Sequence, residues 1–473
     1  MNHNQKRSTI WTLAITSVAL FMVSLDNLVV TTALPVIRRQ LHASISQLEW
    51  TVNAYTLTFA VLLLTGAALG DRFGRRRLFV IGLLLFTGAS AAAALSTSAN
   101  ALDVARALQG VGGAIVTPLT LTILSAAVPR ERRGLALGVW GGIGGLAIAL
   151  GPLVGGAIVN GVSWHWIFWL NVPIGLVMIP LALSRLQETR GPEGHLDLRG
   201  LGLVSTGLFA LVWGLVRGNE VGWSSAEITG AIAASVVLLA LFVRWELRAP
   251  NPMLPLRFFR NRTFALTNVA SLFMFFGMFG SIFLLSQFFQ TAQGYSPLEA
   301  GLRTLPWTGM PMLVAPIAGL LSDRIGSRPL MAAGLALQAT GLAWIAAVAS
   351  PTNAYSSLVI PFVLSGIGMA LFFAPVANVV LSAVRPEEEG KASGANNAIR
   401  ELGGVFGVAV LASVFSHYGG YGTGTSFVNG LTPAVWVGAI VVGAGALAAI
   451  AIPRRKPPVA AAQELEPALE AAA

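Results

Sequence analysis

The sequence contains no cysteine, and only 11% of its 473 residues are charged. Without cysteine the chain can form no disulfide, thiolate metal site or cysteine nucleophile. A soluble domain carries roughly 25% charged residues, so this chain has too few charges to cover a surface in water. Its five histidines are scattered without paired spacing, which argues against a metal site. We therefore expect a membrane protein.

Lysine is also scarce, since it supplies only three of the 30 basic residues. This preference for arginine, together with abundant alanine and glycine, is typical of bacteria with GC-rich DNA. The net charge of +10 could indicate nucleic-acid binding. However, the basic residues gather in short clusters between long apolar runs, which is a membrane pattern. We expect the lipid bilayer, and no nucleic acid, as a partner.

Long apolar runs dominate the sequence, and a membrane helix needs about 20 apolar residues. The first run extends from Ile10 to about Ile37, which is too long for the core of a cleaved signal peptide. We therefore expect an all-α membrane protein. The sequence predicts fourteen transmembrane spans, at 11–37, 48–70, 78–97, 101–125, 134–159, 164–185, 199–217, 226–246, 263–290, 297–321, 329–349, 357–383, 393–416 and 432–452.

The distribution of lysine and arginine between the loops predicts the orientation of the chain. With a cytoplasmic N-terminus, 24 of the 30 basic residues fall on the cytoplasmic side and 4 on the opposite side. The other two, Arg106 and Arg400, fall inside spans. We expect a multi-pass protein of a bacterial inner membrane, with both termini cytoplasmic. These termini are residues 1–10 and a disordered tail, 453–473.

The loop after the second span has a counterpart after the tenth. Residues 70–77 and 322–329 share Asp, Arg, Gly and Arg at a constant offset of 252. The repeat divides the chain into two six-span halves, 11–185 and 263–452, with two inserted spans at 199–246. Duplicated halves are typical of transporters that bind their substrate between the halves and expose it to each side in turn.

Five segments along the chain match motifs of one known family: 25–35 (LDNLVVTTALP), the signature loop 71–77, 106–110 (RALQG), 151–156 (GPLVGG) and 164–175 (WHWIFWLNVPIG). Through these segments the chain resembles the major facilitator superfamily, in its 14-span drug:proton antiporter branch. It departs from the pattern at Ala67, where glycine is usual, and at Asn27–Val29 in the first-span motif.

This resemblance implies a fold of two six-helix bundles plus two inserted central helices. It implies a secondary transporter, not an enzyme, that exports drugs or other amphipathic small molecules in exchange for protons. Such a protein works by alternating access, is driven by the proton gradient and needs no cofactor. We expect a monomer.

Asp26, in the outer half of span 1, is the first candidate site residue. An ionisable group inside a membrane costs about 2.5–3.5 kcal/mol on insertion scales, so such residues usually have a function. Burial penalises the charged form, which makes Asp26 a candidate to load and release a proton. The alternative is a salt bridge that only joins two helices.

Arg106 in span 4 is the candidate cation for Asp26. From 1.5 Å per helical residue, the two residues differ in depth by roughly 7 Å, which an arginine side chain can bridge. The family resemblance also assigns proton coupling to this arginine. Alternatively, Arg106 extends to the headgroups at the membrane surface.

Arg400 and Glu401 form the other charged pair inside a span, span 13. Adjacent helical residues point about 100° apart, so the two do not simply neutralise each other. Glu401, with Arg400, is a second candidate for proton coupling. Alternatively, both side chains lie at the cytoplasmic mouth and reach the headgroups.

The signature loop is a candidate conformational gate. Gly74 permits a tight reversal of the chain. Asp71 can bond Arg75 or Arg76, or the positive N-terminus of a helix in the other half. The alternative is a purely topological signal. The candidate gate residues are Asp71, Arg72, Gly74, Arg75 and Arg76, with Asp323 and Arg324 in the repeated loop.

Span 5 is crowded with glycine. Gly151, Gly155 and Gly156 allow helices to approach closely, and Pro152 kinks the span. The family resemblance identifies these four residues as the antiporter hinge.

Polar side chains within spans, and the aromatic side chains of span 9, are candidate substrate contacts. A large apolar cavity with few polar anchors suits amphipathic drugs. An aromatic stripe can instead face lipid or pack between helices. The candidates are Asn27, Asn53, Tyr55, Phe273, Phe276, Gln287 and Asn378.

The sequence lacks a phosphate loop for ATP. Gly390-Lys391 is followed by Ala392, whereas the loop needs Ser or Thr there. A gradient or a partner must therefore supply the energy, and sparse intramembrane acids favour protons. Two functions stay open: an exporter of drugs or natural products, and a carrier for one endogenous metabolite, siderophore or lipid precursor. An enzyme is disfavoured because the sequence has no catalytic cluster.

Overall fold

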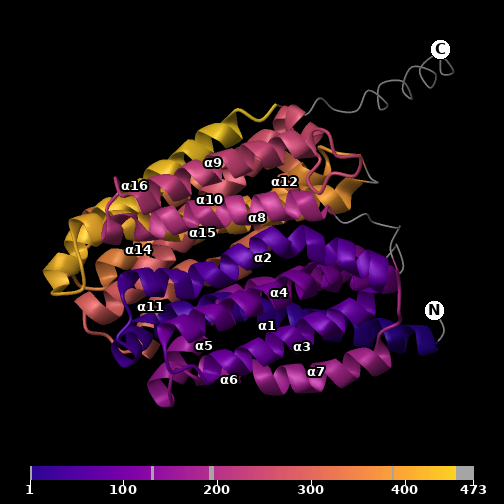
Figure 1. The fold of residues 1–473 in the computed structure, drawn as a ribbon, viewed down its shortest axis with the longest axis horizontal. Coiled ribbons are helices and arrows are strands. Elements are labelled where there is room, and N and C mark those ends of the chain that lie inside the picture. The colour runs from indigo at the N-terminus through magenta and orange to yellow at the C-terminus, as the bar shows by residue number, and fades with distance from the viewer. Residues whose placement is uncertain (1–2, 129–132, 191–196, 386–387, 454–473) are drawn as a thin grey trace, which may run out of the picture.

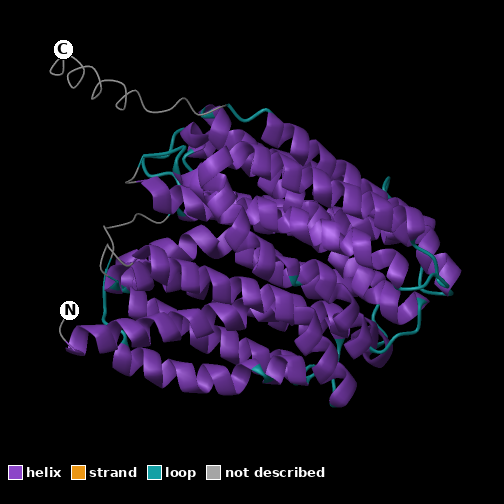
Figure 2. Ribbon diagram, turned by 180° about the vertical axis from the view of Figure 1, so that it is seen from behind, coloured by secondary structure: helices purple, strands orange, loops and turns teal. Residues whose placement is uncertain are grey.

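The computed structural model describes residues 3–128, 133–190, 197–385 and 388–453. Within these ranges Figure 2 shows helices and loops and no strand. The described helices provide 14 segments long and apolar enough to cross a membrane. The predicted all-α fold with 14 spans is confirmed.

Seven helices make up the first half of the chain (Figure 1). Many helices begin at a hydrogen-bonding cap; for example, Ser44 and Gln47 form a capping box at the start of α2. Such caps matter because a backbone group inside a bilayer finds no water as a partner. The helices are α1 (His3–Leu41), α2 (Ile45–Phe73), α3 (Arg75–Ala94), α4 (Ala99–Ala127), α5 (Arg133–Gly161), α6 (Trp166–Trp169) and α7 (Asn171–Arg185).

The inserted pair consists of α8 (Leu198–Val221) and α9 (Ala226–Glu246). The second half is also built of helices that follow one another along the chain. Its elements are η2 (Leu256–Arg260), α10 (Arg262–Gln287), η3 (Phe288–Ala292), α11 (Pro297–Thr308), α12 (Met310–Ile325), α13 (Ser327–Val348), α14 (Ser356–Leu381), α15 (Glu389–Tyr418) and α16 (Gly424–Ile450).

Helix α1 already begins at His3, within the expected N-terminal segment. The spans expected at 164–185 and 297–321 are each present as one candidate span, Trp166–Arg185 and Pro297–Ser322. Each consists of two consecutive helices, which meet at Leu170, three residues before Pro173, and at Gly309, two residues before Pro311. At such prolines the backbone has no N–H to continue the helical hydrogen bonds. Residues 191–196 of the central loop and 454–473 of the tail lie outside the described residues.

The two repeated loops share a backbone feature. Gly74, between α2 and α3, has φ +111°, and Gly326, between α12 and α13, has φ +87°. Residues with a side chain rarely adopt such angles, whereas glycine does so at little cost. The repeat therefore uses glycine at the same turn in both halves.

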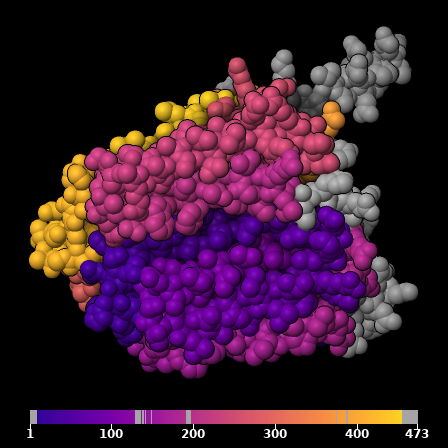
Figure 3. Space-filling model, viewed as in Figure 1, coloured from indigo at the N-terminus to yellow at the C-terminus, as the bar shows by residue number. Residues whose placement is uncertain are grey.

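We call the end of the molecule where α1 begins the near end, and the end where α1 stops the far end. Helix α16 stops at the near end, so both termini lie on one side (Figure 1). Helix α8 packs on α2 and α15 through Leu57, Val212 and Val405, among others. Figure 3 shows residues 198–246 lying along the first half. The inserted pair thus covers the line where the two halves meet.

The two halves are joined towards the far end, along α1 with α10 and α5 with α11–α12. Ser286 Oγ donates to the carbonyl of Thr31 at 2.8 Å, and Gln290 Nε2 donates to that of Thr32 at 2.9 Å. In the other pair, Thr308 Oγ1 donates to the carbonyl of Ala149 at 3.3 Å. The halves are therefore in direct contact on this side.

Candidate functional site

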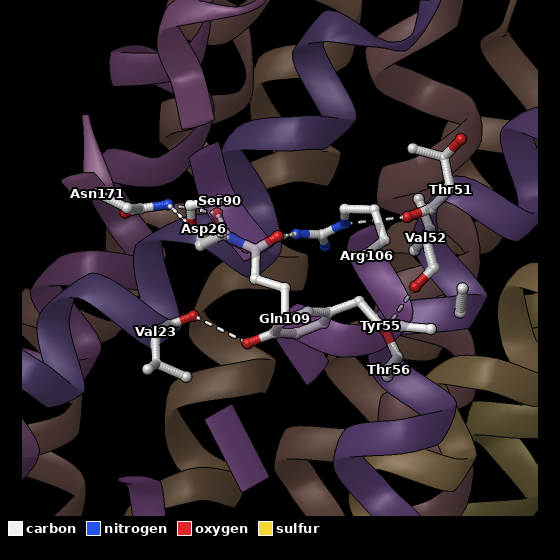
Figure 4. A network of polar contacts seen from close by, with 12 residues as sticks. Val23, Asp26, Thr51, Val52, Tyr55, Thr56, Ser90, Arg106, Gln109 and Asn171 are labelled. Carbon is white, nitrogen blue, oxygen red and sulfur yellow. Dashed lines mark hydrogen bonds and ion pairs between the residues drawn. The ribbon is translucent and has the colours of Figure 1, made fainter. Parts of the chain in front are cut away.

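Asp26 lies in the middle of α1, enclosed by helices of the first half. Its side chain is 0% exposed, so it is as completely buried as any apolar residue of the core. A buried carboxylate without partners would carry a large desolvation penalty, so its surroundings must supply hydrogen bonds. They come from α4 and α7, and Ser90 of α3 bonds the amide groups beside the carboxylate (Figure 4).

Arg106 of α4 forms an ion pair with this carboxylate. Its Nη1 lies 2.5 Å from Asp26 Oδ2, and its own side chain is 1% exposed. The Nε atom donates to the carbonyl of Thr51 at 3.1 Å, and the guanidinium lies 4.2 Å from the centre of the Tyr55 ring. The structure thus brings Asp26, Arg106 and Tyr55 together. Arg106 does not extend to the membrane surface.

Two amide side chains hold the other carboxylate oxygen. Gln109 Nε2 and Asn171 Nδ2 each donate to Asp26 Oδ1 at 2.7 Å. Both amides also reach Ser90 Oγ, at 2.8 and 3.3 Å. Gln109 Oε1 accepts from Arg106 Nη1 at 2.8 Å, which closes the network. Figure 4 shows Asp26 between Asn171 on one side and Arg106 on the other.

The sequence reasoning did not select Gln109, Ser90 or Asn171 as site residues. Gln109 could have been found, because it lies three residues after Arg106 and hence on the same helix face. Asn171 is the one amide in the segment 164–175, between apolar residues and Pro173. Ser90 carries no comparable signal, since small hydroxyl residues are common in membrane helices.

This network has a definite chemical preference. Each contact described for the carboxylate of Asp26 comes from an N–H group, so the network suits the ionised acid. A proton on Asp26 would place a fourth donor among three donors and would remove the attraction between the carboxylate and Arg106. The contacts of this carboxylate join α1 to α4 and α7.

The second charged pair is built differently. Arg400, in α15, lies over the rings of Phe275 (4.4 Å) and Phe373 (5.3 Å), and its Nη1 donates to Asn397 at 3.1 Å. Glu401 Oε2 is buried without a hydrogen-bond partner among the described residues. The two side chains do not join the Asp26 network.

The signature loop pairs within its own half. Arg75 Nε donates to Asp71 Oδ1 at 2.8 Å, and the backbone N–H of Arg76 donates to Glu188 Oε1 at 3.0 Å. A side chain at Gly74 would collide with the Glu188 carboxylate. Arg72 is exposed; in the repeated loop, Arg324 is exposed and Asp323 lies in α12.

The glycines of α5 lie at two interfaces. A Cβ atom at Gly151 or Gly155 would meet α1, at Leu28 and Thr32 respectively. A Cβ at Gly156 would lie 2.3 Å from the carbonyl of Pro297 in α11, and Gly301 of α11 packs equally closely on Pro152. Helix α5 thus touches Asp26's helix with one face and the second half with another.

The candidate substrate residues have different surroundings. Asn53 is fully buried, and neither atom of its amide has a hydrogen-bond partner among the described residues; Asn27 Oδ1 lacks one as well. Gln287 accepts a hydrogen bond from Tyr421, a loop residue whose pKa burial raises, so its phenol stays a donor. Phe276 is buried, Phe273 half-buried and Asn378 exposed.

The described residues thus combine 14 helices long and apolar enough to cross a membrane with a buried network of charged and amide side chains, as expected of a membrane transporter. The model of the Major Facilitator Superfamily matches residues 16–315 and 267–472. The chain belongs to this superfamily, which confirms the resemblance seen in the sequence.

Proteins with known names agree with this assignment. The chain is 36% identical over 402 residues to the tetracenomycin C resistance and export protein of Streptomyces glaucescens, covering 85% of this chain and 74% of that protein. It is 36% identical over 412 residues to the multidrug resistance protein Stp of Mycobacterium tuberculosis, and this match covers 87% of this chain and 76% of that protein. An auto-inhibited POT family peptide transporter has the same fold, with a TM-score of 0.69 at 15% identity over 96% of this chain and 99% of that one.

Proposed function

We propose that this protein exports drugs or other amphipathic small molecules across a bacterial inner membrane in exchange for protons. One observation carries the proposal: a fully buried carboxylate, Asp26, is held only by donors from neighbouring helices. Relatives named for the resistance and export of an antibiotic, or for multidrug resistance, support the type of cargo.

The proposed coupling follows from the network around Asp26. With Asp26 ionised, Arg106, Gln109 and Asn171 tie α1 to α4 and α7. When Asp26 takes up a proton, the attraction to Arg106 is lost and a donor must turn away. The helices are then free to move, so proton uptake and a change of access occur together. Glu401, with Arg400, is the second candidate proton site.

The gate and the hinge act on the same movement. Gly151 and Gly155 of α5 pack on α1, and Gly156 packs on α11 in the second half. Movement of α1 is therefore transmitted through α5 and its Pro152 to the second half. At the near end, the pair Asp71–Arg75 and the other gate residues would hold one arrangement and release it in the next.

The orientation is part of this proposal. The near end is cytoplasmic, because it receives most of the arginine and lysine residues. The far end, where the halves are in contact, is then closed to the outside. The proposed units are a bundle at 11–185, the inserted pair at 199–246 and a bundle at 263–452, working as a monomer.

Asp26→Asn tests the coupling. The purified protein should release protons when an exported compound is added, and the variant should not, because asparagine cannot take up a proton. Glu299→Gln is the matched control: Glu299 is an exposed carboxylate that forms a capping box, and glutamine can cap in the same way. The proposal fails if Asp26→Asn keeps both the proton release and the pH dependence of efflux.

A carrier for one endogenous metabolite, siderophore or lipid precursor is the alternative function. A panel of toxic compounds, applied to a pump-deficient strain that expresses the protein, separates the two. Resistance to several unrelated compounds supports the exporter, and resistance to none of them supports the dedicated carrier.

A further inference from the structure

A cavity of about 750 Å³ lies between the inserted helix α8 and the first half, at the far end. It is formed by the first turns of α2 and α4 and the last turns of α8, along the boundary visible in Figure 3. Sites for small molecules commonly measure about 300–1,000 Å³, so its size is that of a binding site. Asp26, Gln109 and Asn171 do not line it. We call it the lateral cavity.

One wall of the lateral cavity is aromatic. The rings of Trp50, Phe209 and Trp213 lie with their centres 5.6–5.9 Å apart. Two of the lining residues face away from the bundle, since Val104 is 63% and Phe209 47% exposed. Tryptophan is enriched where a membrane helix reaches the lipid headgroups. The cavity therefore opens sideways, towards lipid, at headgroup level.

The rim of the lateral cavity carries charges of both signs. Asp103 and Glu220 line it, and neither forms an ion pair with a described residue. Arg217 also lines it, paired with Glu227 at 3.4 Å and placed over the Trp213 ring at 5.1 Å. Two acids without an ion-pair partner among the described residues, beside one arginine, complement a ligand with an ammonium group next to a phosphate.

We propose that the lateral cavity binds the headgroup of phosphatidylethanolamine from the leaflet at the far end. The ammonium group donates hydrogen bonds to Asp103 and Glu220, the phosphate lies beside Arg217, and the upper part of the acyl chains packs on the aromatic wall. A membrane lipid fits the site because its headgroup and its chains match the polar rim and the open apolar side. Phosphatidylglycerol has no ammonium group and leaves both acids without a partner.

Thr51 connects the lateral cavity to the buried network. Its hydroxyl donates to Asp103 Oδ1 at 2.8 Å, while its carbonyl accepts from Arg106 Nε at 3.1 Å. Asp103 lies one turn before Arg106 in α4, so its negative charge competes with Asp26 for the guanidinium. An ammonium group on Asp103 removes this competition and strengthens the Arg106–Asp26 pair. This regulatory step, the effect of the lipid on the Arg106–Asp26 pair, rests on the proposed function. The binding of the lipid to the lateral cavity does not.

Native mass spectrometry of the purified full-length protein tests the binding. After removal of bound lipid, the protein is offered equal amounts of phosphatidylethanolamine and phosphatidylglycerol with the same acyl chains. We expect about tenfold preference for phosphatidylethanolamine, the size of one charge-assisted hydrogen bond, and loss of that preference in Asp103→Asn. Glu299→Gln, an acid outside the cavity, should keep it.

A matched pair of tryptophan variants tests the aromatic wall. Trp213→Leu should weaken the retention of both lipids, whereas Trp344→Leu, at a 40% exposed tryptophan of α13, should not. Equal retention of the two lipids, or an unchanged preference in a folded Asp103→Asn protein, overturns the proposal. It is also overturned if Asp103→Asn weakens the binding of the cationic dye ethidium but not of phosphatidylethanolamine, since the cavity would then hold cargo.

Efflux measurements keep the two proposals apart. In proteoliposomes, phosphatidylethanolamine should shift the pH dependence of efflux relative to phosphatidylglycerol, and Asp103→Asn should abolish the difference. An equal pH dependence in both lipids contradicts the regulatory step. Absence of proton-coupled efflux in every lipid contradicts the proposed function and leaves the retention result standing.

Discussion

The two halves of this transporter bury different kinds of polar group. Between 263 and 452, the fully buried polar side chains of the described residues carry hydroxyl or amide groups. The first half buries Asp26, Glu49 and Arg106 to 2% exposure or less. In the second half, Arg400 and Glu401 are only partly buried as whole residues. Complete burial of charged side chains is therefore a feature of the first half among the described residues.

The amide groups make the contrast clearer. In the second half, Asn396 Nδ2 donates to Asn268 Oδ1 at 3.0 Å and to Ser271 Oγ at 3.1 Å. This arrangement joins α15 to α10 with no charge at its centre. In the first half, the amides of Gln109 and Asn171 surround a carboxylate. One network only fixes helices, whereas the other also responds to a proton.

The largest expected effect comes from breaking the ion pair. Arg106→Met leaves Asp26 as a buried acid without its cation, which should destabilise the protein by about 3–5 kcal/mol. Replacing both residues, as Asp26→Leu with Arg106→Met, should restore most of this stability and make the first half resemble the second. Thermal unfolding of the purified protein measures both effects. The double variant should still show no proton-dependent efflux.

Arg400→Met is the control in the second half. Because Arg400 forms no ion pair with a residue in the described part of the chain, its loss should cost much less than the loss of Arg106. Equal destabilisation by the two substitutions would contradict the contrast between the halves.

An intermediate effect is expected from the amides. Asn171→Ala removes one of the hydrogen bonds to a charged group, worth about 1.5–3 kcal/mol. Because this donor binds the carboxylate on which the proposed coupling depends, the pH dependence of efflux should change. Asn396→Ala, the matched amide of the second half, should leave it unchanged; a similar shift in both variants would mean a general packing effect.

The smallest effect is expected at the second charged pair. Glu401→Gln keeps the shape of a side chain that has no ion-pair partner among the described residues. Efflux should change by about twofold or less, corresponding to roughly 0.5 kcal/mol. Dose-dependent growth in the presence of an exported compound measures it. If Glu401→Gln abolishes efflux while Asp26→Asn does not, the essential acid lies in the second half.

The sequence identified those site residues whose burial in a membrane costs free energy. Asp26 and Arg106 stood out because charges inside spans are rare, and the 14 spans followed from hydropathy and charge bias alone. Ser90 and Asn171 did not stand out, because neutral polar groups occur in many spans and only their position in space gives them a role. The junction of α6 and α7 at Leu170, within one span, was not predicted either, since hydropathy averaged over a whole span does not register the local effect of Pro173.

The contact between the halves at the far end has a property that suits repeated use. Its three donors, Ser286, Gln290 and Thr308, all belong to the second half, and all three acceptors are backbone carbonyls of the first. Each donor also lies within 3.5 Å of a carbonyl in its own helix or the preceding one, those of Phe283, Ser286 and Thr304. If the halves separate, each donor can therefore exchange a carbonyl of the first half for one in its own half. The contact would open without leaving a side-chain donor unpaired. Because its acceptors are backbone carbonyls, it would form again whatever side chains the first half presents.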